Sequence, residues 1–172
     1  EKDSELPKKI DKAVFPGLQG GPHENSIAGI AVCLKEASLS VFKKYAAQIV
    51  KNARILAEDL KNYGFNLISG GTDNHLILID LRNKNITGAE AQELLERAGI
   101  TVNKNSIPYD SAGPFKPSGL RLGTPAITTR GMKEKEMKII AGWINRVISN
   151  PASAKKVREE IKKFCKRFPL PG

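Results

Sequence analysis

One arginine stands between two glycines in an otherwise apolar segment of this 172-residue chain. Leu120 and Leu122 alternate about Arg121, and Gly119 and Gly123 let backbone or a ligand approach closely, so the segment predicts a short buried strand. A guanidinium there needs an anionic partner, because a charge that loses water without pairing is costly. Its planar fork matches a carboxylate or a phosphate. A structural ion pair and a bound ligand anion both remain open on these residues alone.

Two further segments have a composition suited to ligand contact. Residues 14–22 carry three glycines and two prolines, which predicts a loop with exposed backbone donors, and an amphipathic helix follows from Glu24 to about Glu36. A turn of this kind before a helix suits a phosphate, although most such turns are only turns. The predicted loop from Asn103 to Pro117 leads into the Arg121 strand, and its length favours a functional loop over a mere connection.

The composition gives little support for a metal site, a redox site or a membrane segment. Cys33 and Cys165 lie far apart, with no CxxC pattern or histidine spacing, so we expect free thiols and no metal site. The longest apolar stretches, such as residues 76–81, are too short to span a bilayer, and residues 1–13 are polar and charged. We therefore expect a cytoplasmic protein without a membrane segment.

The net charge of +10 is concentrated near the C-terminus, where residues 133–172 hold eleven lysines and arginines against four glutamates. The basic residues between Lys155 and Arg167 recur with helical spacing, without the interleaved aromatic residues of strand-based RNA-binding modules. This pattern fits a solvated helix face, and it also fits attraction of RNA or another polyanion.

The elements that must position these residues follow from periodicity and end signals. Apolar spacing predicts helices over residues 24–36, 40–62, 88–98, 133–149 and 152–167, and strands over residues 65–68, 75–81, 100–102 and around Arg121. Thr87 and Glu90 form a capping box, and Gly64 and Gly99 stand at helix ends. The order predicts an α+β fold in which a small, mostly antiparallel sheet packs against helices.

Four ordered motifs resemble the C-terminal part of serine hydroxymethyltransferases: Phe15–Pro22, Gly70–His75, Val102–Asn105 and Ser118–Ala126. The resemblance spans essentially the whole chain and implies a fold-type I pyridoxal-phosphate enzyme. It implies that residues 1–37 are the C-terminal remnant of the cofactor-binding large domain and that residues 38–172 are the C-terminal small domain. It further implies a homodimer or homotetramer that interconverts serine plus tetrahydrofolate with glycine plus 5,10-methylenetetrahydrofolate.

The resemblance also implies roles for individual residues. Arg121 matches the arginine that binds the substrate carboxylate, and Gly20 and Gly21 match glycines whose backbone meets the phosphate of pyridoxal phosphate in the neighbouring subunit. Asn105 and the segment Gly113, Pro114 and Phe115 match positions that contact folate.

The family's Schiff-base lysine, which follows a threonine-rich motif and a histidine, has no counterpart among these 172 residues. The resemblance therefore implies no catalytic residue in this chain, dependence on an N-terminal half of the enzyme, and inactivity of the chain alone. Two alternatives remain. A stand-alone basic module would bind RNA, folate or a partner protein. Another fold-type I enzyme, such as an aminotransferase, would share the arginine but would not explain residues 103–105 together with the Gln19–Gly21 loop.

Overall fold

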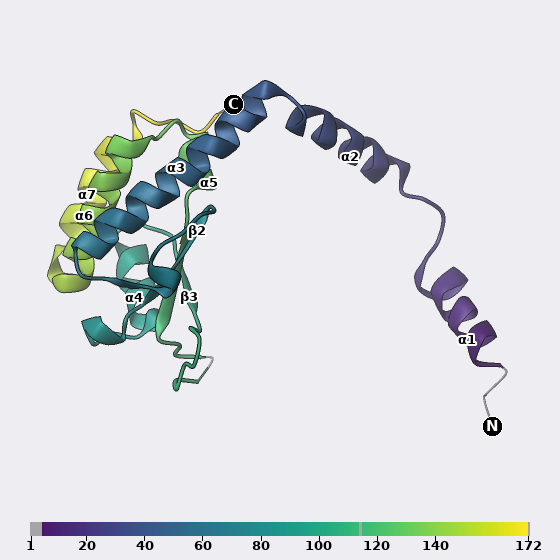
Figure 1. Ribbon diagram of the computed structural model, residues 1–172, viewed down its shortest axis with the longest axis horizontal. Coiled ribbons are helices and arrows are strands. Elements are labelled where there is room, and N and C mark those ends of the chain that lie inside the picture. The colour runs from purple at the N-terminus through teal and green to yellow at the C-terminus, as the bar shows by residue number, and fades with distance from the viewer. Residues whose placement is uncertain (1–4, 114, 172) are drawn as a thin grey trace. The chain divides into compact units, whose positions relative to one another are not determined.

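The computed structural model describes residues 5–113 and 115–171, and the chain forms two compact units that divide between Phe42 and Lys43. The first unit contains α1 (Leu6–Lys12), a helical turn (Ala13–Leu18) broken at Phe15 and Pro16, α2 (Glu24–Ala37) and the first residues of α3 (Ser40–Asn62) (Figure 1). The segment predicted as a loop thus begins as a helical turn. The domain division after Ala37 stays a prediction.

The second unit holds the rest of α3 and a four-stranded sheet with its helices. In chain order its elements are β1 (Asn66–Leu67), β2 (Leu76–Asp80), α4 (Gly88–Arg97), β3 (Asn103–Asn105), β4 (Gly119–Gly123), α5 (Pro125–Thr129), α6 (Glu134–Ser149) and α7 (Ala154–Cys165), with short turns at Ile68–Gly70, Arg82–Lys84 and Pro151–Ser153. The strands are all antiparallel, in the order β1-β2-β4-β3. The predicted α+β fold with a small antiparallel sheet is confirmed.

Local signals explain why the longer helices form and end where they do. Helix α3 buries Ala53, Leu56 and Leu60 at helical spacing, and the chain leaves it through Gly64, whose φ of 75° favours glycine. Helix α4 begins with the predicted capping box, because the Thr87 hydroxyl accepts from the backbone N–H of Glu90 while Glu90 accepts from the backbone N–H of Thr87.

The core lies on one face of the sheet. Side chains alternate along β2 and β4, and Ile77, Ile79 and Leu120 are fully buried against the helices. Helices α3, α6 and α7 gather beside the strands (Figure 1), and their inner residues Leu60, Met137, Ile144 and Val157 are 1% exposed or less. The strand residues between these buried ones, such as Leu78 on β2 and Arg121 on β4, lie on the opposite face of the sheet.

Two details of the predicted elements are wrong. Residues 100–102 are not a strand; Val102 is buried, and strand pairing starts only at Asn103, which lies opposite Arg121. An apolar residue can enter the core from irregular backbone, so hydrophobicity alone does not locate the hydrogen-bonded ladder. The short helix α5 between the Arg121 strand and α6 was not predicted.

Within the described residues, no cluster of three or more metal-ligating side chains exists, and Cys33 and Cys165 are both free thiols. In the same part of the chain, no single helix has the length and apolar character needed to cross a membrane. Only α2 and α3 taken together, as a bent pair, satisfy that requirement of length and composition.

Candidate functional site

Arg121 lies at the middle of β4, on the face of the sheet opposite the hydrophobic core of the second unit. Its Cα partners are Leu78 on β2 and Asn103 on β3. Leu120 and Leu122 point into the core, whereas Arg121 is exposed. The prediction of a buried strand therefore holds for the two leucines and is wrong for the arginine, because alternation sends its side chain to the other face.

No ionic partner meets the Arg121 guanidinium among the described residues. Each acidic side chain that forms an ion pair within the described residues pairs with a lysine or arginine other than Arg121. The structural ion pair that the sequence left open is therefore not formed within residues 5–113 and 115–171. The planar donor fork is available to an anion from outside the chain.

Asn105 shares this face with Arg121, since it pairs with Gly119 two positions away along β4. The Asn105 side chain is half-buried, and its Nδ2 donates to the Ser106 carbonyl at 2.6 Å. Close approach of backbone makes the pairing possible. A Cβ on Gly119 would lie 2.4 Å from Ile107 Cγ2 and 2.6 Å from the Asn105 carbonyl oxygen, so the predicted role of this glycine in close packing is borne out by the geometry.

The loop between β3 and β4 carries the remaining positions predicted to contact folate. Gly113 is exposed, and Phe115 is 84% exposed, so neither is part of the core. Pro114 lies outside the described residues. The Lys104 ammonium donates to the Phe115 carbonyl at 2.9 Å and ties this part of the loop to β3.

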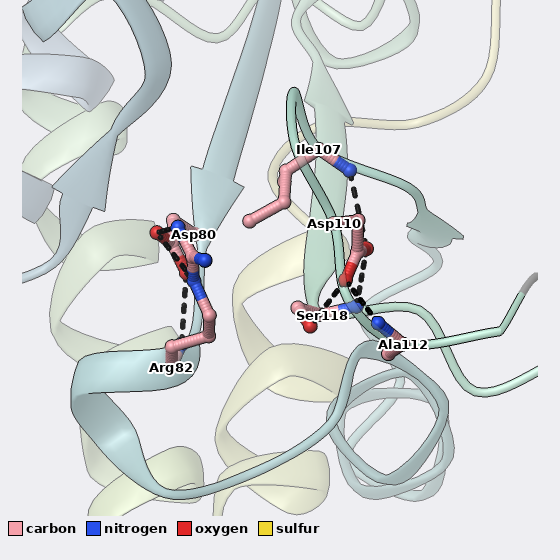
Figure 2. Close-up of polar contacts among 6 residues, drawn as sticks. All are labelled: Asp80, Arg82, Ile107, Asp110, Ala112 and Ser118. Atoms are coloured by element: carbon pink, nitrogen blue, oxygen red, sulfur yellow. Dashed lines mark hydrogen bonds and ion pairs between the residues drawn. The ribbon is translucent and has the colours of Figure 1, made fainter.

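Asp110 organises the loop, and sequence reasoning missed it. Its carboxylate accepts from the backbone N–H and the hydroxyl of Ser118 and from the backbone N–H of Ala112 and Ile107 (Figure 2). The N–H and hydroxyl of Ser118, followed by the other N–H groups, hold the pKa of Asp110 far below its ordinary value of 3.8. No sequence signal marks the residue, because its partners are mainly backbone groups.

A second carboxylate, Asp80, lies at the end of β2 and faces a different partner. Its two oxygens accept from Nε and a terminal nitrogen of Arg82 at 2.8 to 3.1 Å, and it also accepts the Arg82 backbone N–H (Figure 2). The Arg82 guanidinium lowers the pKa of Asp80, and Asp80 in turn raises the pKa of Arg82. This pair stabilises the turn after β2, which carries none of the predicted site residues.

Gly20 and Gly21 lie in the first compact unit, just before α2. A Cβ on either would meet nothing within 4 Å, and both residues are exposed. Among the described residues neither backbone N–H has an acceptor, and His23 gives α2 no side-chain cap. Free N–H groups before a helix suit the phosphate end of pyridoxal phosphate.

A cavity of about 270 Å³ lies elsewhere, on the core side of the sheet. It is lined mainly by apolar residues, including Leu122, Trp143 and Phe164, and by none of the residues predicted to bind substrate, cofactor or folate. The residues predicted to bind the substrate carboxylate and folate lie instead on β3, on β4 and in the loop that joins them.

Comparison with known proteins agrees with the four motifs. The family profile described as serine hydroxymethyltransferase matches residues 1–144. The chain is 54% identical over 172 residues to a serine hydroxymethyltransferase of Desulfotalea psychrophila (strain LSv54 / DSM 12343). That alignment covers 98% of this chain and 40% of the relative, so the chain spans less than half the relative's length. On both grounds, the chain belongs to the serine hydroxymethyltransferase family.

Proposed function

We propose that this chain supplies the substrate-carboxylate and folate side of a serine hydroxymethyltransferase active site. The reaction converts serine and tetrahydrofolate to glycine, 5,10-methylenetetrahydrofolate and water. The observation that carries the proposal is Arg121, an exposed arginine without an ionic partner among the described residues, on the same sheet face as Asn105 in a chain of this family.

The residues present divide the work. Arg121 binds and orients the serine carboxylate through its planar pair of donors. Asn105 and the segment from Gly113 to Phe115 contact the folate, where the exposed Phe115 ring offers an apolar surface. The backbone N–H groups of Gly20 and Gly21 receive the cofactor phosphate of a neighbouring subunit in a homodimer or homotetramer.

Pyridoxal phosphate supplies the electron sink that stabilises the amino-acid carbanion. The family's lysine that would hold this cofactor covalently has no counterpart among the 172 residues. We therefore propose that the chain acts together with a cofactor-binding N-terminal half and is inactive alone.

The test uses the chain co-expressed with an N-terminal segment that bears the lysine. We expect the complex to retain pyridoxal phosphate, to absorb visible light and to convert serine to glycine with tetrahydrofolate. Arg121→Ala should raise the KM for serine by about 10-fold to 100-fold, as expected for loss of a hydrogen-bonded charge pair of roughly 1.5–3 kcal/mol, with the cofactor retained.

Arg54→Ala is the matched control, because Arg54 is an exposed arginine on α3 without a partner among the described residues. It should leave the serine KM unchanged. Robust turnover by the 172-residue chain without the other half would refute the proposed dependence, and an unchanged serine KM in Arg121→Ala would refute the role of the arginine.

A further inference from the structure

We infer that Asp110 is a positioning residue for folate, because its carboxylate clamps the loop that carries Gly113 and Phe115 to the first residues of β4 (Figure 2). The inference rests on the proposed function, which places folate at this loop. In this role Asp110 does not touch the substrate; it holds the backbone of the loop whose residues, Gly113 and Phe115, contact the folate.

Both oxygens of the carboxylate are engaged, and their partners come from both sides of the loop. Oδ1 accepts from the Ala112 N–H at 3.0 Å and from the Ser118 hydroxyl at 2.7 Å. Oδ2 accepts from the Ser118 N–H at 2.9 Å and from the Ile107 N–H at 3.3 Å. One side chain thus joins the end of the segment that leaves β3 to the residue that enters β4.

The segment from Gly113 to Pro117 is the part of the loop closed off by these bonds, since Ala112 and Ser118 flank it. Within it, the Lys116 N–H donates to the Gly113 carbonyl at 3.1 Å, and the Phe115 carbonyl accepts from Lys104. Of the described residues in this stretch, Gly113, Phe115 and Lys116 are exposed, whereas Pro117 is buried and its carbonyl accepts from the Gly88 N–H at 2.7 Å. Gly88 and Lys104 each bond one carbonyl of this stretch, whereas the Asp110 clamp joins its two flanking residues and so fixes the places of Gly113 and Phe115 relative to Asn105 and Arg121.

The clamp also holds an unfavourable backbone conformation. Tyr109, directly before Asp110, has a φ of 55°, in the left-handed region that residues other than glycine and asparagine seldom adopt. The Tyr109 side chain is fully exposed. Nothing in the Tyr109 side chain compensates for this conformation. The hydrogen bonds of the next residue supply the compensation, which is how strained backbone is usually maintained at ligand loops.

Asp110→Asn tests the inference in the cofactor-loaded complex with the N-terminal half. Asparagine keeps the shape but replaces one acceptor oxygen with a donor that faces N–H groups, so part of the clamp must open. We expect the KM for tetrahydrofolate to rise at least 10-fold, while the KM for serine stays within about 2-fold of the parent. Ser118→Ala, which removes one donor only, should shift the folate KM in the same direction by less.

Asp80→Asn is the matched control, because Asp80 also holds a turn through a carboxylate but serves the segment after β2. It should lower thermal stability and leave the folate KM unchanged. An unchanged folate KM in Asp110→Asn, an equal rise in Asp80→Asn, or parallel losses for serine and folate would each overturn the inference.

Amide hydrogen exchange on the 172-residue chain gives a readout independent of activity. Asp110→Asn should accelerate exchange at Ala112 and Ser118 and leave Leu120 protected, and uniform acceleration across the sheet would contradict a local clamp. A parent complex without serine turnover would refute the proposed function itself. An active parent with a silent Asp110→Asn variant would refute only the role of Asp110.

Discussion

At the residue scale, the charged groups of the exposed sheet face and its loops differ in whether the chain itself satisfies them. Asp80 is paired in a fork with Arg82, and Asp110 accepts four hydrogen bonds. Arg121 has no such partner among the described residues. Arg121 therefore differs from the two carboxylates in being available to bind an anionic ligand.

The two carboxylates predict how stability changes with pH. Arg82 lowers the pKa of Asp80, and the Ser118 donors lower the pKa of Asp110, so both acids bind protons less readily in the folded than in the unfolded chain. Their contribution is fully present above the unfolded-state value of 3.8 and is lost as the pH falls toward the folded-state values. The free energy of unfolding should therefore decline below about pH 4 in urea titrations.

Asp80→Asn provides the check on that sign. The variant should be less stable than the parent at pH 6, and the difference should narrow below pH 4, because the parent's advantage depends on the ionised form. A difference between the two proteins that stays constant from pH 6 to pH 3 would show that Asp80 stabilises the fold by something other than its charge.

At the element scale, the site depends on two close approaches of backbone. Gly88 at the start of α4 donates its N–H to the Pro117 carbonyl at 2.7 Å, and a Cβ on Gly88 would lie 2.0 Å from the Gly119 carbonyl oxygen. A Cβ on Gly119 would also be too close, at 2.4 Å from Ile107 Cγ2 and 2.6 Å from the Asn105 carbonyl oxygen. The start of α4, the loop and β4 are therefore held together where only glycine fits.

Gly88→Ala should consequently destabilise the chain by about 1–3 kcal/mol, because the added methyl group meets backbone that cannot rotate away. Urea unfolding followed by circular dichroism measures the change.

Gly142→Ala on α6 is the matched control, since a Cβ there meets only the Tyr63 hydroxyl at 3.5 Å. It should be neutral or stabilising by roughly 0.5–1 kcal/mol through helix propensity. Equal destabilisation by the two substitutions would argue against the close contact at Gly88.

At the scale of the whole molecule, the exposed apolar surface of α2 bears on the choice between half an enzyme and an independent basic module. Ile27, Ile30 and Leu34 recur at helical spacing and are 56%, 59% and 65% exposed. An uncovered apolar stripe is a liability for a stand-alone module and is ordinary for a surface that a partner covers. The exposed apolar stripe on α2 therefore favours the proposal that an N-terminal half covers this surface over the alternative of an RNA-binding module.

The 172-residue chain should accordingly bind a hydrophobic dye through this stripe. Replacing Ile27, Ile30 and Leu34 with serine should lower dye fluorescence, and so should co-expression with the N-terminal half, since each removes exposed apolar surface. Lys35→Ser, also exposed on α2, is the control. Dye binding that persists in the co-expressed complex would favour the independent module, whose RNA affinity would then be measured against salt.

Much of the fold was accessible from local patterns. The helical spacing from Ser40 to Asn62, the capping box at Thr87 and the glycine at position 64 each encode hydrogen bonds or burial within a few residues, and the structure confirms them. The strand predicted at residues 100–102 was wrong because pairing depends on a partner strand far away in sequence. Asp110 was missed because backbone donors leave no trace in residue type.

By itself, the sequence determined that Arg121 is set between glycines in a strand, that the chain is α+β, and which family it resembles. Only the tertiary structure decided that Arg121 faces away from the core without an ionic partner among the described residues, beside Asn105, and that Asp110 closes the loop between them. The physical reason is the sequence separation over which each interaction acts. Periodicity and caps are local, whereas register, facing and the satisfaction of a charge arise only when distant segments pack together.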